Sequence, residues 1–155
     1  MSAESEALIP PDGPVEIINR RIFAASRDLV FEAFSNPDYL AQWWGPRGFT
    51  NTFHKFEFKP GGAWEFTMHG PNGANYENAS EFIEIAKPER IVFVHLREVH
   101  RYQMTITLTG DSERTVLTWQ MVFESASQNV KFKHFIFDAN EQNFDRLEAL
   151  LKSMQ

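Results

Sequence analysis

The feature that most constrains the fold is a series of segments in which apolar and polar residues alternate, followed by one long amphipathic segment. Residues 64–69, 102–109 and 117–123 alternate in this way. Such a period of two predicts strands with one face in a core and the other in solvent. Residues from about 129 to Lys152 instead repeat apolar side chains at helical spacing. This helix is the only predicted element large enough to cover the apolar face of an antiparallel sheet.

The predicted order is one strand, two short helices, six strands and one long helix. Arg20 and Arg21 interrupt the alternation of the first strand, which leaves its register open. Ser125 and Gln128 have the spacing of a capping box in front of the long helix. The predicted strands cover residues 15–24, 50–58, 64–69, 75–85, 91–96, 102–109 and 117–123.

The second short helix has clear start and stop signals. Asn36 followed by Pro37 is typical of a helix N-terminus, and Gly45-Pro46 is typical of an end. The helix closes on two adjacent tryptophans, Trp43 and Trp44. Because two indole rings are costly to leave in water, we expect at least one of them to pack inward.

Several of these motifs occur together in the order of a known family. They are residues 30–34, Asn36-Pro37, Trp43-Trp44-Gly45-Pro46, residues 60–64, 84–93 and 144–151. In them the chain resembles the START-like, helix-grip superfamily (the SRPBCC group), and in particular the branch related to the C-terminal domain of the activator of the Hsp90 ATPase. The resemblance extends from about Val15 to Leu151.

The resemblance implies an α+β, helix-grip (START/Bet v 1-like) fold. In it, a curved antiparallel sheet of about seven strands wraps around the C-terminal helix, and the gap between them can hold an apolar molecule. We expect a single domain over residues 15–152, preceded by a flexible tail over residues 1–14. The superfamily hosts binders, cyclases and chaperone regulators, so it specifies no activity.

Composition excludes several classes of function. The chain of 155 residues has no cysteine, which excludes thiol catalysis, disulfides and cysteine metal sites. Its formal net charge of −6 argues against non-specific nucleic-acid binding. Neither a membrane span nor a signal peptide is recognisable. We therefore expect a cytoplasmic protein, and the family branch suggests a bacterial one.

Aromatic content is high, with 15 Phe, 4 Trp and 3 Tyr. Such side chains fill cores and also line apolar ligand cavities. If the sheet and the helix leave a gap, we expect the ligand to contact the inner strand faces, the N-terminal half of the helix and two polar side chains. The predicted binding residues are Trp64, Phe66, Met68, Tyr76, Asn78, Met104, Ile106, Trp119, Met121, Phe132, Phe135, Ile136, Ala139 and Asn140.

No catalytic or metal-binding constellation is recognisable, and we predict neither a metal nor a cofactor. The five histidines, His54, His69, His95, His100 and His134, lack the spacing of a metal site and are interpreted as separate surface or hydrogen-bonded residues. There is no Gly-x-Ser-x-Gly elbow. Glu84 and Arg90 flank a predicted turn, where an ion pair is favoured over a catalytic acid.

The polar residues of the long helix allow two interpretations. Asn140, if buried, needs hydrogen-bond partners, and these are either a strand backbone or a polar group of a ligand. Glu141 and Asp145 are four residues apart, and we interpret them as part of a solvated face.

Three functions remain open. The first is binding of a small hydrophobic or amphipathic molecule, and the second is an enzyme acting on an apolar substrate, of the polyketide cyclase or dehydratase kind. The third is regulation of an Hsp90-type chaperone, which only the resemblance supports. An exposed edge strand would permit a homodimer, although the net charge is equally compatible with a monomer.

Overall fold

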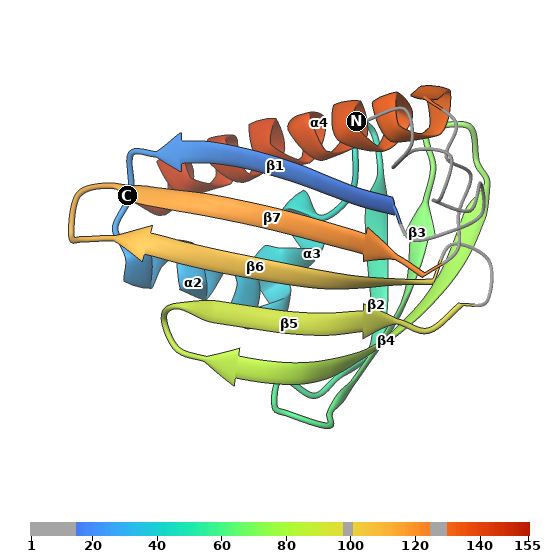
Figure 1. Cartoon of the computed structure of the whole chain (residues 1–155), viewed down its shortest axis with the longest axis horizontal. Coiled ribbons are helices and arrows are strands. Elements are labelled where there is room, and N and C mark those ends of the chain that lie inside the picture. Colours follow the sequence, from blue (N-terminus) through green and yellow to red (C-terminus); the bar gives the residue numbers. More distant parts are fainter. Residues whose placement is uncertain (1–14, 98–100, 125–129) are drawn as a thin grey trace, which may run out of the picture.

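The computed structural model describes residues 15–97, 101–124 and 130–155. Within them, seven strands form one antiparallel sheet in the order β1-β7-β6-β5-β4-β3-β2 (Figure 1). The predicted α+β helix-grip architecture, with two short helices after the first strand, is confirmed. The elements are β1 Val15–Phe23, α2 Arg27–Ser35, α3 Pro37–Trp43, β2 Thr50–Phe56, β3 Ala63–His69, β4 Asn75–Ala86, β5 Arg90–His95, β6 Tyr102–Gly110, β7 Thr115–Phe123 and α4 Val130–Met154.

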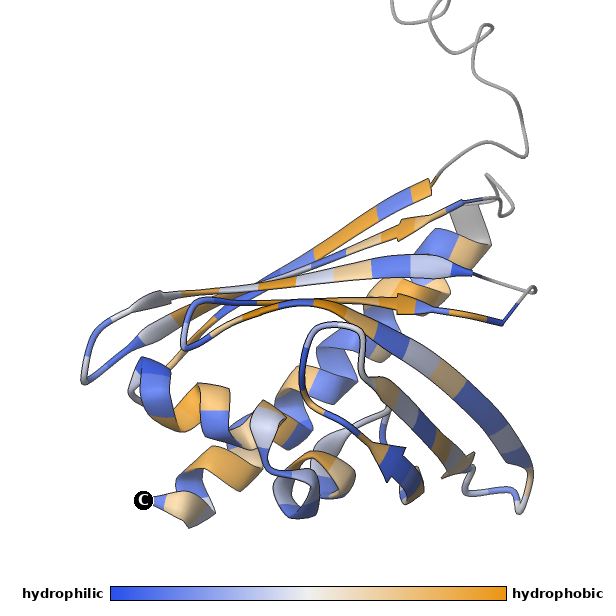
Figure 2. Ribbon diagram, turned by 90° about the horizontal axis from the view of Figure 1, so that it is seen from below, coloured by the Kyte–Doolittle hydropathy of each residue, from blue (hydrophilic) through white to orange (hydrophobic). Residues whose placement is uncertain are grey.

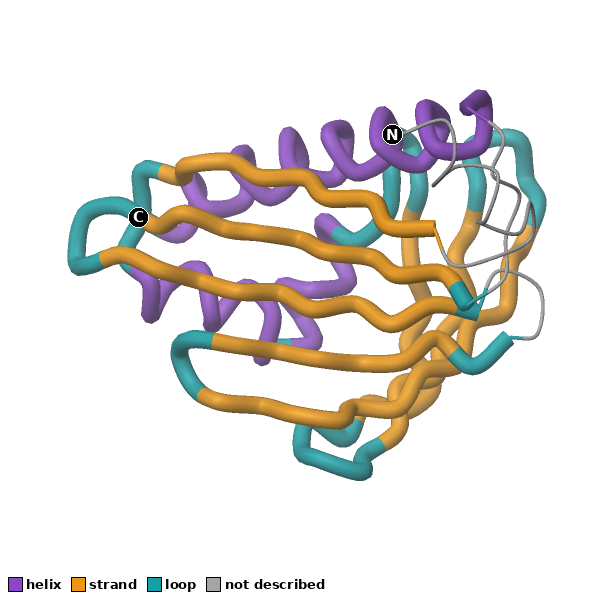
Figure 3. The backbone as a smooth tube through the Cα atoms, in the orientation of Figure 1, coloured by secondary structure: helices purple, strands orange, loops and turns teal. Residues whose placement is uncertain are grey.

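All three helices lie on the same side of the sheet, which curves over them (Figure 2). Two irregularities in strand pairing contribute to the curvature, between Phe53 and Lys55 in β2 and between Phe82 and Glu84 in β4. Such bulges bend a strand and increase its twist. The tube in Figure 3 shows β4 following this bend from the main sheet toward the side of the molecule where β2 and β3 lie.

Helix α4 is anchored through its C-terminal half. Phe144, Leu147 and Leu151 are at most 2% exposed, and the Phe144 ring meets Phe23 and Trp119 at centroid distances of 5.9 and 5.3 Å. In the N-terminal half, Phe135 is 71% exposed. The core therefore lies mainly under the second half of the helix, whereas in the first half Phe132 and Ile136 are only partly buried against it and Phe135 is exposed.

The short helices begin where the sequence signals predict. The Ser26 side chain accepts a hydrogen bond from the Leu29 N–H, and the Asn36 side chain accepts one from the Asp38 N–H. Both Trp43 and Trp44 are buried, which confirms the expectation that at least one packs inward. The Trp43 indole N–H donates to the Ala33 carbonyl across 2.9 Å.

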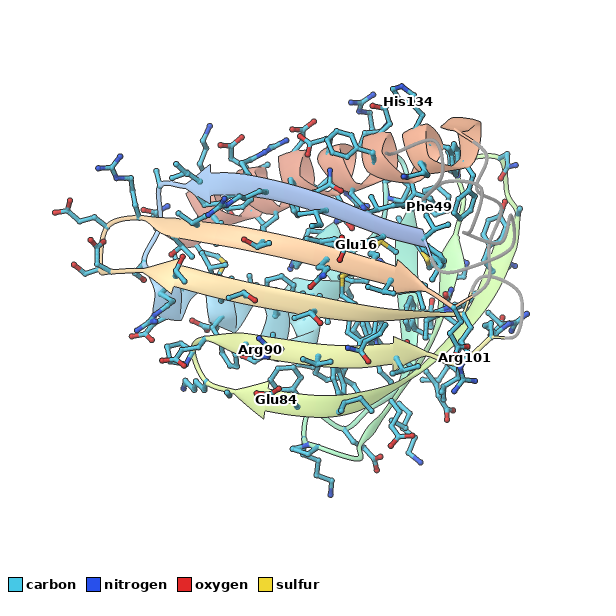
Figure 4. All side chains as sticks on the ribbon, in the orientation of Figure 1. Glu16, Phe49, Glu84, Arg90, Arg101 and His134 are labelled. Atoms are coloured by element: carbon cyan, nitrogen blue, oxygen red, sulfur yellow. The ribbon has the colours of Figure 1, made fainter. Side chains whose placement is uncertain are left out.

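Two local predictions have different outcomes. Glu84 and Arg90 form an ion pair of 3.1 Å between neighbouring strands, as expected (Figure 4). The solvated face predicted for Glu141 and Asp145 is wrong in part. Both carboxylates bind Arg21 of β1, at 2.9 and 2.8 Å, because α4 runs along that strand (Figure 1). Arg21 thus occupies an inward position, and β1 keeps its alternation.

Most strand boundaries agree with the prediction to within two residues. Three predictions lie outside the described residues: the tail over residues 1–14, the capping box of Ser125 and Gln128, and His100. Among the described helices, none is long and apolar enough to cross a membrane.

The anchoring of α4 can be tested by truncating one aromatic side chain in each half. We expect Phe144→Ala to lower the free energy of unfolding by about 3–5 kcal/mol, because it opens a cavity among buried rings. Phe135→Ala, on the exposed half of the same helix, should change it by less than about 0.5 kcal/mol. Urea denaturation measures both, and equal losses would contradict the anchoring.

Candidate functional site

A cavity of about 780 Å³ lies between the curved sheet and the N-terminal half of α4. Phe135 and Tyr76, which line it from opposite sides, are 71% and 48% exposed, so the cavity opens to solvent between α4 and the start of β4. Its volume falls within the range of small-molecule sites. The lining residues are Trp44, Gly45, Pro46, Phe49, Met68, Asn75, Tyr76, Glu77, Asn78, His95, Arg97, Tyr102, Met104, Trp119, Met121, Phe123, Phe132, Phe135, Ile136, Ala139, Asn140 and Asn143.

Eleven of the fourteen residues predicted to contact a ligand line this cavity. They are Met68, Tyr76, Asn78, Met104, Trp119, Met121, Phe132, Phe135, Ile136, Ala139 and Asn140.

The other three, Trp64, Phe66 and Ile106, are buried in the core and do not line the cavity. Trp64 is enclosed by rings, with Phe66 stacked at 4.5 Å and Trp44 edge-on at 5.0 Å. Alternation predicts the face to which a side chain belongs. It does not predict how far along the strand the core ends and the cavity begins.

Sequence reasoning missed the contribution of the turn between α3 and β2. Trp44, Gly45, Pro46 and Phe49 form one end of the cavity, where the Trp44 ring stacks on Trp119 at 5.2 Å. The start and stop signals of α3 located this turn, but nothing in them indicated that it faces the cavity. Also missed were Asn75, Glu77, His95, Arg97, Tyr102, Phe123 and Asn143.

Two side chains of α4 hold this turn in place. Arg146 donates to the carbonyls of Gln42, Trp44, Gly45 and Pro46 at 2.7–3.2 Å. Asn143 accepts from the Gly45 N–H at 3.2 Å and donates to the Trp43 carbonyl at 2.7 Å. These bonds satisfy carbonyls at the end of α3 that have no partner within a helix. Because burial removes water from the guanidinium, the pKa of Arg146 is lowered.

Gly45 allows the turn to approach β3 closely. Its φ is +102°, in the region that favours glycine, and a Cβ there would lie 2.8 Å from the Met68 methyl carbon. The turn and Met68 could not both keep their places in the cavity wall with a larger residue at this position.

The strand side of the cavity carries a polar cluster. His95 Nε2 lies 2.9 Å from Asn78 Oδ1, and the His95 ring stacks on Tyr102 with centroids 4.9 Å apart. The Asn78 amide nitrogen donates to the Tyr76 carbonyl, so the Asn78 oxygen faces His95. Because that oxygen only accepts, His95 Nε2 carries the proton of this hydrogen bond. The apolar surroundings raise the pKa of the Tyr102 hydroxyl, which keeps it neutral.

On the helix side, Asn140 is 7% exposed and donates to Asn19 Oδ1 of β1 at 2.9 Å. Its partner is thus a strand side chain and not the strand backbone. The other described histidines lie elsewhere. His54 and His69 bond to Thr67 and Thr52 on β3 and β2, and His134 points away from the sheet (Figure 4). Within residues 15–97, 101–124 and 130–155, no group of three or more His, Asp or Glu side chains could hold a metal ion.

A sheet that curves around one long helix, with an apolar cavity between them, defines a helix-grip domain. A model of the family described as "Activator of Hsp90 ATPase homolog 1-like protein" matches residues 24–152. The chain therefore belongs to the activator of Hsp90 ATPase homolog 1-like family. No curated protein matches it.

Solved structures share the fold at low sequence identity. A protein from Staphylococcus epidermidis has a TM-score of 0.78 at 18% identity, over 96% of this chain and 95% of that one. A protein from Nitrosomonas europaea has a TM-score of 0.75 at 18% identity, over 90% and 96%. The protein described as AHSA1 from Silicibacter pomeroyi has a TM-score of 0.73 at 17% identity, over 91% and 100%. These likenesses establish the fold alone.

The role of Arg146 can be tested by replacing it with an apolar side chain of similar length. We expect Arg146→Met to lower the free energy of unfolding by about 2 kcal/mol, because it leaves carbonyls of the turn unpaired. Arg47→Met is the matched control, since the Arg47 side chain is exposed in the same turn. Thermal and urea unfolding measure both, and a loss no greater than that of the control would contradict the role.

Proposed function

We propose that this protein binds a small, predominantly apolar molecule in the cavity between the sheet and the N-terminal half of α4. The observation that carries the proposal is a solvent-open cavity of about 780 Å³ in which 11 of the 22 described lining residues are Phe, Trp, Tyr or Met. Burial of an apolar ligand there removes apolar area both from the ligand and from the protein. Methionines such as Met68, Met104 and Met121 adapt to ligands of varied shape.

Charge supports the same ligand class. Among the residues that the structure describes, Glu77 and Arg97 are the charged side chains in the lining, and both are exposed, which places them at the rim. The described inner wall contains no Asp, Glu, Lys or Arg, and an ion bound deep in the cavity would lose its hydration without a counter-charge from these residue types. The ligand body is therefore expected to be neutral, and a charged group on the ligand would have to stay at the rim.

Binding can be measured with 1,6-diphenylhexatriene, an apolar fluorescent probe that has no hydrogen-bonding group. We expect saturable enhancement of its emission by the wild-type protein. Ala139→Trp should abolish most of it, because the indole would fill the cavity. The same substitution at Ala149, which is exposed on the same helix, should leave binding unchanged.

Native mass spectrometry of freshly purified protein complements the titration, since a co-purifying molecule would begin to identify the natural ligand. Absence of saturable probe binding in the wild type, or equal binding by the two tryptophan variants, would refute the proposal.

A second function is favoured by the family match, whose description refers to an activator of the Hsp90 ATPase. Under it, the protein would bind an Hsp90-type chaperone and stimulate its ATPase. The test is the steady-state ATPase rate of the chaperone with and without this protein. A stimulation that persists in Ala139→Trp would separate this activity from the cavity.

A further inference from the structure

The side-chain amides that line the cavity differ in how they are bonded. Asn143 uses both its oxygen and its nitrogen on the backbone of the α3–β2 turn. Asn78 likewise uses both, on His95 and on the Tyr76 carbonyl. Asn140 donates through its nitrogen, but within the described part of the chain its oxygen accepts no hydrogen bond. Asn140 therefore has a free acceptor in the wall of an apolar cavity.

The orientation of the Asn140 amide follows from the groups behind it. The Asn19 side-chain nitrogen donates to the Phe137 carbonyl at 3.2 Å and to Glu141 Oε2 at 2.7 Å. A carbonyl and a carboxylate only accept, so the nitrogen of Asn19 must face them. The Asn19 oxygen then faces Asn140, which must present its own nitrogen. This arrangement directs the Asn140 oxygen away from Asn19.

The hydrogen bonds that run from Asn140 through Asn19 to Glu141 form a relay, and Arg21 holds its Glu141 end. Its guanidinium binds Glu141 Oε1 at 2.9 Å and Asp145 at 2.8 Å, and lies over the Phe144 ring. Glu141 is thereby held with its second oxygen on Asn19. Asn19 is only 1% exposed, so water does not compete for these bonds. The relay therefore links a surface ion pair to the amide in the cavity wall.

From this geometry we infer that the cavity recognises a hydrogen-bond donor, a hydroxyl or an N–H group, on a neutral apolar ligand, and that the donor binds the Asn140 oxygen. The inference rests on the proposed function and specifies the ligand class. A ligand carboxylate at this depth would face an acceptor. The indole N–H of Trp119 is covered by protein and cannot serve such a carboxylate. Asn19 is a positioning residue, because it orients the amide without lining the cavity.

The test compares two ligands of similar size, 4-hydroxybiphenyl and 4-methoxybiphenyl, by displacement of 1,6-diphenylhexatriene. We expect the wild type to bind the phenol about fivefold to tenfold more tightly, the effect of one net hydrogen bond. Asn140→Leu should abolish this preference while the ether and the probe bind as before. Asn140→Ala removes the same oxygen without added bulk and serves if the leucine variant does not fold.

Two further variants separate recognition from structural effects. Asn19→Leu should reduce the preference, because the Asn140 amide is then free to turn its nitrogen toward the ligand. Arg47→Met should leave the preference intact, because the Arg47 side chain is exposed and does not line the cavity. Equal affinities for phenol and ether in the wild type, or a preference that survives removal of the Asn140 oxygen, would overturn the inference. So would tighter binding of biphenyl-4-carboxylate than of the phenol.

The outcomes for the two proposals are distinguishable. The probe has no hydrogen-bonding group, so its failure to bind would refute the cavity itself. Probe binding without discrimination between phenol and ether would refute only the assignment to Asn140.

Discussion

The attachment of the α3–β2 turn to the middle of α4 is the interaction on which the site depends. Arg146 and Asn143 together bond to six backbone groups between residues 42 and 46, five carbonyls and one N–H, and Arg146 alone accounts for four of the carbonyls. These bonds set the position of Trp44, which stacks on Trp119 and closes one end of the cavity. They act together with the Trp43 indole hydrogen bond to Ala33 and the ring contacts of Trp44 at the end of this seven-residue helix.

The cavity follows from a mismatch between one helix and a strongly bent sheet. Phe144, Leu147 and Leu151 are buried, and the rings of Phe23 in β1 and Trp119 in β7 pack against Phe144. Toward the N-terminus of α4 the sheet continues to curve (Figure 2). There the helix lines the cavity with Phe132, Phe135, Ile136 and Ala139, of which Phe132 packs on Phe123 of β7 at 5.2 Å. An aromatic-rich sequence can thus build a dense core and an apolar cavity from the same strands.

The fold was largely predictable from the sequence because β3, β6 and β7 carried a clear alternation and α3 carried both a start and a stop signal. Half of the described residues that line the cavity, 11 of 22, were among those predicted. Whether the other residues belong to the core or to the cavity wall depends on tertiary contacts. Trp64, Phe66 and Ile106 have the pattern of their neighbours, and only the position of α4 determines that they are core. Arg21 looked like an interruption of β1, since its partners Glu141 and Asp145 are about 120 residues away.

The uneven anchoring of α4 has a thermodynamic consequence for the protein as a whole. A helix fixed by its second half can lose its first turns at a cost well below that of global unfolding, since few core contacts hold them. A molecule in the cavity would contact the apolar side chains of these first turns and so extend the hydrophobic core. Occupancy would then appear as slower amide exchange in the first turns of α4 and as a melting temperature that rises with ligand concentration. In such a domain, the amount of ordered helix would report on the concentration of the bound molecule.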